Sequence, residues 1–350
     1  MKRITIKEIA KRAGVSVGTV DRVLHNRGEV AEATKKEVLR IAKEGNYTTN
    51  VFARSLKLNQ VHKIAVILPL DNEYWQTQQS GIQEAAEEYE SLGLQLKFFP
   101  FDRSNQGSFL SKAAMAIEDQ PDAVILAPLM EEEATDICSQ LGKLKIPFVF
   151  VDSNLERLSP LAFIGQDSVQ SGYLAAKLLT YGLWEGPEVF VLKYADFDSL
   201  NKTIDERLEG FKSFYKEKKW KTDLIKEVNV KKEFDPDEIF DKDSALVFVP
   251  NSRAHQIAKR LALKAGDKQF RIVGYDLIRE NAEALDSGRV DFILDQNPKL
   301  QGQQGIQAIY KKLIVNTEVK QYQFMPLEVV TKENLKYANS YDGLGTKKAE

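Results

Sequence analysis

The apolar residues of the first 45 positions recur at spacings of three and four, a pattern typical of amphipathic helices. Three segments carry it: residues 6–13, residues 17 to about 25, and residues 32–44. The side chains that the pattern turns inward are Ile6, Ile9, Ala10 and Ala13 in the first segment, Val20, Val23 and Leu24 in the second, and Val38, Ile41 and Ala42 in the third. We expect three short helices that share one small core.

Polar residues and glycines stand at the predicted ends of these helices. Thr5 and Ser16 are expected N-caps, because a hydroxyl side chain can accept a hydrogen bond from an unpaired N–H of the first turn. Gly14 interrupts the pattern after the first helix, and Gly45 is expected to end the third helix in the left-handed conformation. The face that the second helix turns outward consists of Val17, Gly18, Asp21 and Arg22.

From residue 63 onward, short apolar runs alternate with helical stretches, which predicts parallel sheets built from βαβ units. The first series of predicted strands covers residues 64–70, 94–101, 123–129 and 148–151. The second series covers residues 188–194, 245–249, 271–275 and 291–294. Two separate series indicate two open sheets and therefore two lobes.

The charge of the chain is unevenly distributed. The net charge of the 350 residues is only −2. Residues 1–63 hold 14 Lys or Arg against 6 Asp or Glu and so carry +8, which leaves −10 for residues 64–350. A basic module beside an acidic remainder is typical of a nucleic-acid-binding segment, although a solvated basic surface would give the same numbers.

Composition and motifs exclude several other classes of protein. Hydrophobic residues make up 43% of the chain, but no apolar run can cross a bilayer and no secretory signal begins it, so we expect a cytoplasmic protein without membrane association. Cys138, the single cysteine, is interpreted as a buried structural thiol, and the three scattered histidines offer no zinc site. The Gly-x-Ser-x-Gly match at residues 14–18 follows a helix rather than a strand. We expect no cofactor, no metal and no catalytic residue, and hence no enzyme.

The N-terminal segment resembles the LacI/GalR family of bacterial repressors. The resemblance is carried by Thr5-Ile-Lys-Glu-Ile-Ala-Lys-Arg-Ala-Gly-Val-Ser-Val-Gly-Thr-Val-Asp-Arg-Val-Leu, by Asn46-Tyr47 and by Asn50-Val-Phe-Ala-Arg-Ser-Leu-Lys-Leu. It implies a helix-turn-helix whose second helix enters the major groove of operator DNA. The positions that match the base-reading positions of the family are Val17, Gly18 and Arg22.

The side chains at these positions suggest a role for each residue in DNA binding. Arg22 can bond bidentately to guanine or hold a phosphate, and both interpretations stay open. Val17 can touch a thymine methyl group, whereas Gly18 has no side chain with which to read a base. The residues expected to contact the DNA backbone are Thr5, Ser16, Thr19 and Asn26, and His25 is either a further phosphate contact or a structural residue at the helix end.

A second DNA contact is implied by the match to the hinge helix of the family. About eight residues from Asn50 are too few for a helix that is stable alone. By the resemblance, two such helices pair over the minor groove and Leu56 wedges into a base step, while Arg54 and Lys57 contact the DNA nearby. The alternative is that Leu56 packs beneath the next domain.

The remaining chain looks like the two-lobed periplasmic-binding-protein fold that this family uses as its sensor. The fold class is therefore expected to be α plus α/β, with lobe crossings near Gly165, Gln296 and Met325. A helix from residue 298 to about 315 returns to the first lobe, and a final strand at about 327–331 joins the second. The expected organisation is a helix-turn-helix domain at 1–49, a hinge helix and linker at 50–62, a ligand-binding domain at 63–338 (lobe 1 about 63–165 and 296–325, lobe 2 about 166–295 and 326–338), and a polar tail at 339–350.

Ligands of open parallel sheets bind beyond the carboxyl ends of the strands. The residues that follow the predicted strands and are expected to bind a ligand are Asn72, Tyr74, Trp75, Asp152, Asn154, Arg207, Asn251, Asp276 and Gln296. Carboxylates, amides and a guanidinium beside aromatic rings suit a sugar. Tyr74 and Trp75 can equally be packing residues at a helix start.

The hypothesis from sequence is a homodimeric transcriptional repressor whose operator affinity is controlled by a carbohydrate bound between the lobes. A sugar receptor without DNA binding, in the cytoplasm or periplasm, is the alternative. A sugar-processing enzyme fused to a DNA-binding module is a third. The sequence leaves open whether the effector releases or recruits the operator.

Overall fold

A computed structural model describes residues 4–24, 28–45, 47, 61–70, 72–105, 107–194, 202–231, 233–240, 244–264 and 269–338. The chain divides into two compact units, Met1–Leu58 and Asn59–Glu350. The expected hinge helix and polar tail lie outside the described residues.

The smaller unit contains the three predicted helices, α1 (Ile6–Ala13), α2 (Val17–Leu24) and α3 (Glu32–Glu44). Their inward positions form one core, in which Ile9, Val20 and Val38 are fully buried. Thr5 caps α1 in a reciprocal arrangement: its hydroxyl accepts from the backbone N–H of Glu8, and the Glu8 carboxylate accepts from the backbone N–H of Thr5. Local spacing and capping therefore account for this unit.

Gly45 does not have the left-handed conformation that the sequence predicts. Its φ is −84°, and the glycine is required for space instead, because a Cβ at this position would collide with the side chain of Ile4. The backbone N–H of Ile4 donates to the Gly45 carbonyl at 3.2 Å. Gly45 thus lets the chain before α1 pack against the end of α3.

The larger unit holds two six-stranded sheets. The first has the order β11-β5-β4-β3-β1-β2 and is parallel throughout. Its strands are β1 (His62–Ile67), β2 (Leu94–Phe98), β3 (Ala123–Leu126), β4 (Phe148–Val151), β5 (Ala162–Gly165) and β11 (Tyr322–Phe324). Strands β3, β4 and β5 are buried along their whole length, as expected of a sheet covered on both faces.

The second sheet has the order β12-β10-β9-β8-β6-β7, with only the β10–β12 pair antiparallel. Its strands are β6 (Val189–Tyr194), β7 (Ile225–Val230), β8 (Ser244–Phe248), β9 (Gln269–Tyr275), β10 (Phe292–Asp295) and β12 (Glu328–Val330). The chain thus leaves the first sheet after β5, returns to it for β11, and ends in the second.

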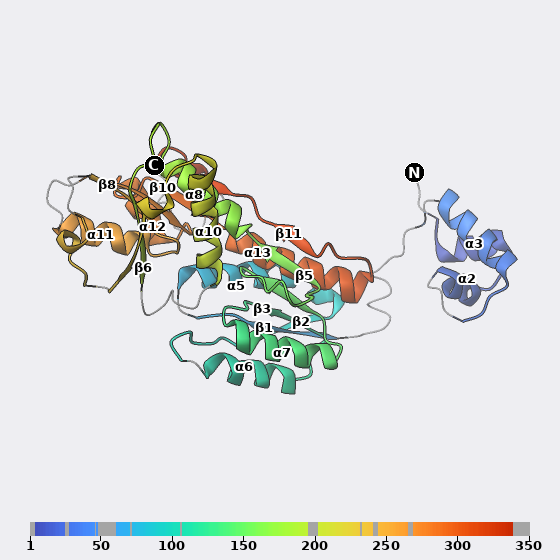
Figure 1. Ribbon diagram of the computed structural model, residues 1–350. Helices are drawn as coiled ribbons and strands as arrows, with labels where there is room; N and C mark the ends of the chain where they lie inside the picture. Colours follow the sequence, from blue (N-terminus) through green and yellow to red (C-terminus); the bar gives the residue numbers. More distant parts are fainter. Residues whose placement is uncertain are drawn as a thin grey trace, which may run out of the picture. The chain divides into compact units, whose positions relative to one another are not determined.

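Helices cover both faces of each sheet. Helices α5 (Glu73–Glu87) and α13 (Pro298–Tyr310) pack on one face of the first sheet, and α6 (Ser108–Glu118) and α7 (Glu131–Lys143) on the other (Figure 1). A π-helical turn, Lys311–Val315, extends α13. In the second lobe, α8 (Ser168–Leu179) and α10 (Lys202–Glu217) cover one face, and α11 (Ala254–Lys264) and α12 (Arg279–Asp286) the other.

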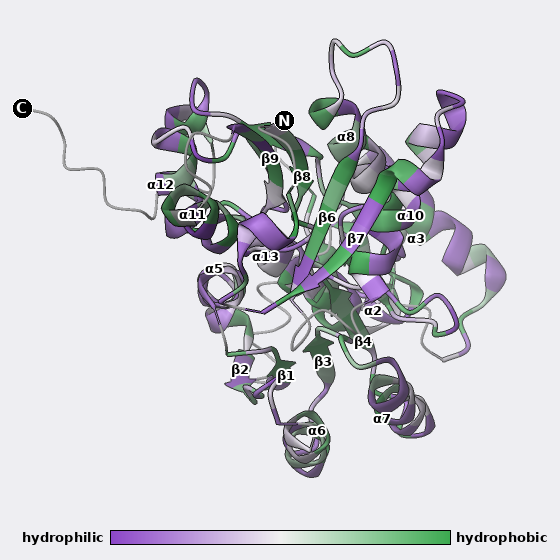
Figure 2. Ribbon diagram, turned by 60° about the vertical axis from the view of Figure 1, so that its left-hand side comes forward, coloured by the Kyte–Doolittle hydropathy of each residue, from purple (hydrophilic) through white to green (hydrophobic). Residues whose placement is uncertain are grey.

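Hydropathy follows these layers. Figure 2 shows β3 and β6 coloured as hydrophobic, while α6 and α7 alternate between the two colours. Single-turn 3₁₀ helices, Glu90–Leu92, Thr222–Leu224, Pro236–Glu238 and Leu335–Tyr337, occur in the connections. Cys138 is a buried residue of α7, and burial raises the pKa of its thiol to about 12, which fits the predicted structural role. The predicted two-lobed α/β architecture is confirmed.

Three strands have no counterpart in the sequence prediction. Strands β5 and β11 are short, with four and three residues. Strand β7 reads Ile-Lys-Glu-Val-Asn-Val and buries only its two end residues, so it lacks the apolar run that marks the other strands. Predicted strands such as 64–70 and 94–101 were also too long, since β1 and β2 end at Ile67 and Phe98.

Close backbone approach joins one helix pair in each lobe. In the first lobe, a Cβ on Gly81 of α5 would collide with the Lys299 carbonyl of α13. In the second lobe, a Cβ on Gly172 of α8 would collide with the Arg207 carbonyl of α10. Both pairs flank the same region between the lobes, so glycine sets how closely the helices that carry cleft residues can approach.

A buried glutamine connects the three segments that cross between the lobes. Gln166 follows β5, and its Nε2 donates to the carbonyl oxygen of Asp295 at 2.7 Å and to that of Pro326 at 2.9 Å. Asp295 ends β10, and Pro326 lies between β11 and β12. The three crossings are therefore held together at one side chain that is 2% exposed.

Candidate functional site

Helix α2 presents the outward face that the sequence predicts. Val17 is 47% exposed, Gly18 and Arg22 are also exposed, and Val20 and Val23 are buried against the other helices. The Nε of Arg22 donates to the Gly18 carbonyl at 3.3 Å. The Nε atom of Arg22 therefore lies close to the helix backbone, and the guanidinium group is on an exposed face of the helix.

The polar residues that flank this face cap helices. The Ser16 hydroxyl accepts from the Thr19 N–H at 3.0 Å and lies 2.9 Å from the Thr19 hydroxyl. Thr5 caps α1 as described above. A role in positioning DNA would come in addition to these structural contacts.

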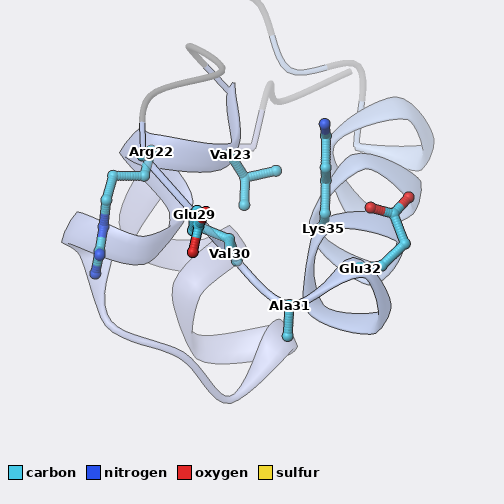
Figure 3. Close-up of a pocket in the computed structure, with 8 residues that line it drawn as sticks. Arg22, Val23, Glu29, Val30, Ala31, Glu32 and Lys35 are labelled. Atoms are coloured by element: carbon cyan, nitrogen blue, oxygen red, sulfur yellow. The ribbon is translucent and has the colours of Figure 1, made fainter.

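An open hollow of about 470 Å³ adjoins Arg22. Figure 3 shows Arg22 and Val23 on α2, Glu32 and Lys35 on α3, and residues 29–31 between them. The N-cap position of α3 is Ala31, which offers no side-chain acceptor to the first N–H groups of the helix. This surface therefore combines two cationic side chains, Arg22 and Lys35, and two carboxylates, Glu29 and Glu32, with the positive end of a helix.

Some predicted DNA contacts lie outside the described residues. They are His25, Asn26, Arg54, Leu56 and Lys57.

The second candidate site is a cleft between the two lobes at the carboxyl ends of the strands. It is lined by Asn72, Tyr74, Trp75, Arg103, Leu129, Asp152, Thr203, Arg207, Asn251, Ser252, Arg253, Asp276 and Gln296. Its volume is about 50 Å³. In this arrangement of the lobes the cleft has room for a few water molecules.

Asp152 is the most heavily hydrogen-bonded carboxylate of the cleft. Its Oδ1 accepts from the Tyr74 hydroxyl at 2.7 Å, and its Oδ2 accepts from the Ser153 hydroxyl at 2.8 Å. Gln301 of α13 supports the arrangement: its Oε1 accepts from the Asp152 N–H and from Nε2 of Gln78, both at 3.0 Å. Its Nε2 donates to the Tyr74 hydroxyl at 3.2 Å and to the Gln296 carbonyl at 2.9 Å.

This network decides the direction of its hydrogen bonds. Because the Tyr74 oxygen accepts from Gln301, its own hydrogen is given to Asp152. Burial, followed by the nearby carboxylates of Asp152 and Asp276, raises the pKa of the Tyr74 phenol well above its usual value. The phenol therefore remains a donor, and the Asp152 carboxylate is held in one orientation.

Asp276 stands at the matching place in the second lobe with fewer partners. Its Oδ1 accepts from Nε2 of Gln296 at 2.6 Å. Burial raises the pKa of Asp276 to about 7, opposed by the positive charge of Arg207 and the Gln296 hydrogen bond and assisted by the charges of Asp152 and Asp295. Near neutral pH this carboxyl group is poised between its two protonation states.

Arg207 of α10 is 3% exposed and lies over the ring of Tyr275, with 3.7 Å between Cζ and the ring centroid. Its Nη1 donates to the Pro250 carbonyl at 2.8 Å. The Tyr275 hydroxyl lies 3.0 Å from the Ser171 hydroxyl, which anchors the ring beneath the guanidinium. The side chain is thus held at one end and on one face.

Hydrogen bonds between described residues connect the lobes at the cleft. The Ser153 hydroxyl lies 3.0 Å from that of Thr203, and Nδ2 of Asn72 donates to the Ser252 hydroxyl at 3.4 Å. The Arg279 N–H donates to Oε2 of Glu73 at 2.9 Å. Opening of the cleft has to break these contacts.

The structure brings together most of the predicted ligand-binding residues. Those that line the cleft are Asn72, Tyr74, Trp75, Asp152, Arg207, Asn251, Asp276 and Gln296. Asn154 does not line it. Asp152 has a left-handed backbone, with a φ of 68°, and the lining includes this residue but nothing further along the turn.

Sequence reasoning missed five lining residues, namely Arg103, Leu129, Thr203, Ser252 and Arg253. The rule that cleft residues follow strands could have found Arg103 and Arg253, which come after β2 and β8. Thr203 lies four residues before Arg207 on α10, so helical periodicity from a predicted site residue was the available signal. Gln301 acts through other residues, and no sequence signal marked it.

Comparison with known proteins gives two family matches. Residues 64–316 match the family described as periplasmic binding protein domain, and residues 5–50 match the family described as bacterial regulatory proteins, lacI family. The chain belongs to the LacI family of bacterial regulatory proteins. In this LacI-family chain the helix-turn-helix is the region 5–50, and the two lobes are the periplasmic-binding-protein domain.

Individual relatives are also named as transcriptional regulators. The transcriptional regulator DegA of Bacillus subtilis is 29% identical over 185 residues, which is 51% of this chain and 53% of DegA. The sucrose operon repressor of Klebsiella pneumoniae is 36% identical over 140 residues, 38% of this chain and 40% of the repressor. A crystal structure assigned as a LacI transcriptional regulator from Bacteroides fragilis is 29% identical, with a TM-score of 0.71, over 80% of this chain and 100% of that one. The LacI-family chain thus spans about half the length of the first curated relatives that it matches.

Among the described residues of the LacI-family chain, no helix is both long and apolar enough to pass through a membrane. Within the same residues, no three His, Cys, Asp or Glu side chains are grouped so that they could hold a metal ion.

Proposed function

We propose that this chain is a transcriptional repressor that binds operator DNA as a homodimer and changes its operator affinity when a carbohydrate effector binds between the lobes. The observation that carries the proposal is the presence in one chain of an exposed α2 face and of a buried polar cleft. A receptor that does not bind DNA does not need the exposed α2 face. A DNA-binding protein without an effector does not need the polar cleft. Such a protein acts in the cytoplasm, where it meets the operator.

The DNA-binding half of the proposal rests on the α2 surface. Arg22 and Val17 project from exposed positions of a helix that is held by a core of its own. Arginine bonds to the O6 and N7 atoms of guanine in the major groove, and a valine can contact the methyl group of thymine. In a symmetric dimer, two such helices would read two half-sites of a palindromic operator. The predicted hinge residue Leu56 is proposed to contact the minor groove between them.

The effector half rests on the chemistry of the cleft. Amides from Asn72, Asn251 and Gln296 and carboxylates from Asp152 and Asp276 converge on one place. These groups donate to and accept from hydroxyls, and the ring of Trp75 offers an apolar surface. This combination favours a carbohydrate.

Coupling between the halves follows from lobe movement. Ligand binding and the interlobe hydrogen bonds, such as Ser153–Thr203, depend on the same cleft width. An effector that prefers one width shifts the equilibrium between lobe arrangements, and the shift is worth about 1 to 3 kcal/mol in typical allosteric proteins. The operator affinity would then change about 5- to 150-fold.

Selection of operators from a random DNA pool by the full-length chain tests the DNA-binding half. Arg22→Ala should weaken binding to the selected sequence about 5- to 150-fold, because one base or phosphate contact is worth about 1 to 3 kcal/mol. Arg40→Ala is the matched control. It removes the same charge from α3, where Arg40 pairs with Glu37 and Glu44 on the surface, and should weaken binding less than about threefold.

Equal losses in the two variants would contradict sequence-specific contact by Arg22. Absence of any enriched sequence would favour the receptor hypothesis, in which the chain does not bind DNA. Light scattering of the free chain and of the DNA complex checks the dimer, since a single chain per operator would contradict two-fold recognition.

A further inference from the structure

The guanidinium of Arg207 has one edge without a hydrogen-bond partner. Its Nη1 is bound to the Pro250 carbonyl and its face lies against the Tyr275 ring. The Nε and Nη2 nitrogens are buried and have no hydrogen-bond partner. A buried polar donor without an acceptor is destabilising, so this edge indicates a group that is bound in use.

The geometry of the edge is selective. Nε and Nη2 point their hydrogens in parallel from the same side of a planar group. Two oxygen atoms of one carboxylate or one phosphate match this fork, and a bidentate pair of this kind is stronger and more directional than a bond to a single hydroxyl. Stacking on Tyr275 keeps the plane of Arg207 from rotating.

The charges of the described lining residues favour an anion as well. Three arginines, Arg103, Arg207 and Arg253, line the cleft against two aspartates. Both oxygens of Asp152 already accept from hydroxyls of its own lobe. Asp276, with a pKa of about 7, is partly protonated at neutral pH. The formal charges of these lining side chains therefore sum to a positive value, which favours an anionic ligand over a neutral one.

We propose that the effector is an anionic sugar, a sugar acid or a sugar phosphate, whose charged oxygens accept hydrogen bonds from Nε and Nη2 of Arg207. This inference rests on the proposed sensor function and narrows its ligand class. The amides and hydroxyls around Asn251 and Gln296 bind the sugar hydroxyls. Carboxylate and phosphate share the required chemistry, and the binding experiment distinguishes them.

Calorimetric titration of the full-length chain with matched ligands tests the inference. The ligands are D-galactose, D-galacturonate and D-galactose 6-phosphate, and the same three forms of D-glucose. Within a series, the acid or the phosphate should bind at least tenfold more tightly than the neutral sugar. The form that binds better identifies the charged group.

Arg207→Lys keeps the charge but removes the fork, and should reduce the affinity for the anionic sugar at least tenfold, a larger factor than for the neutral sugar. Arg289→Lys, at an exposed position of the same lobe, is the control and should change neither affinity. Because Arg207→Lys can also disturb folding, proton uptake by the wild-type chain provides a second readout. An anion that occupies Arg207 takes away charge that stabilises ionised Asp276, which also faces Asp152, Asp295 and Gln296, so binding near pH 7 should take up protons.

The outcomes separate this inference from the proposed function. Neutral sugars that bind as tightly as their anionic forms would overturn the anionic ligand but leave a sugar sensor. Lack of binding by all six ligands would overturn the inference and the carbohydrate class together, while the operator experiments stand or fail separately. Anion binding without proton uptake, and equal in Arg207→Lys, would place the anion elsewhere and also overturn the inference.

Discussion

The two halves of the cleft have the same backbone conformation at their aspartates, but the carboxylates of these aspartates have different hydrogen-bond partners. Asp152 follows β4 and Asp276 follows β9, each with a φ of 68°. The N–H of each donates at 3.0 Å to the last part of the neighbouring strand, at Ile164 and Leu294. Aspartate tolerates this left-handed conformation better than most residues, which explains its presence at both turns.

The side-chain environments of these two aspartates diverge. Asp152 has hydroxyl donors on both oxygens, from Tyr74 and Ser153. Asp276 has the Gln296 amide and the nearby charge of Arg207, and its pKa is raised to about 7. The first lobe therefore holds a fixed carboxylate, whereas the second holds one whose charge depends on its surroundings. A ligand can alter the second much more than the first.

The largest effects are expected at the glycines that give both halves the same helix packing. Gly81→Ala and Gly172→Ala should each lower the free energy of unfolding by about 3 kcal/mol or more, because the added Cβ meets a backbone carbonyl of the partner helix. Urea unfolding followed by tryptophan fluorescence measures this in the larger unit, which contains all three tryptophans.

Gly142→Ala in α7 is the control, since nothing lies within 4 Å of its Cβ. It should stabilise the protein by up to about 1 kcal/mol. A large loss for only one of Gly81 and Gly172 would show that the two helix pairs are not equivalent.

The difference between the carboxylates predicts a pH effect. Asp276 has a raised pKa, so its contribution to stability is complete below the pKa of the unfolded chain, about 4, and is lost as the pH rises to about 7. Between pH 5 and 7 the wild type should lose about 2 to 3 kcal/mol more unfolding free energy than Asp276→Asn, at about 1.4 kcal/mol per pH unit. Parallel pH profiles of the two proteins in urea unfolding would refute the raised pKa.

The fixed carboxylate of the first lobe is tested by Tyr74→Phe. This change leaves buried Oδ1 of Asp152 without its donor and removes one acceptor of Gln301, at an expected cost of about 2 kcal/mol. Tyr337→Phe, at a side chain that is 73% exposed, should change stability by less than about 0.5 kcal/mol. Equal unfolding free energies for both variants would mean that the Asp152 network does not stabilise the lobe.

The smallest effect is expected for a hydrogen bond that joins the halves. Asn72→Ala removes the 3.4 Å contact with Ser252, and also the side-chain cap on the Trp75 N–H, which is 3.3 Å long. Both bonds are long, so we expect a loss near 1 kcal/mol at most. A loss above about 2 kcal/mol in urea unfolding would show that interlobe contacts contribute more than the geometry suggests.

The residues of the cleft could be predicted from the sequence where they follow the end of a predicted strand. Asn251 and Asp276 were found because each comes within three residues of a strand end, and the carboxyl ends of parallel strands meet at one edge. Asn154, two residues beyond Asp152, satisfies the same rule but does not line the cleft. Gln301 could not be found, since its four hydrogen bonds reach residues between 5 and 227 positions away.

Sequence alone determined the helices of the small unit and the alternation that makes two sheets, because spacing, capping and apolar runs act over a few neighbouring residues. Gly45 shows the limit even there, since its partner Ile4 lies on another segment. Only the tertiary structure decided which polar side chains are paired and which edge of Arg207 has no partner. Hydrogen-bond satisfaction and pKa depend on burial and on atoms brought together from distant positions, and no local pattern encodes them.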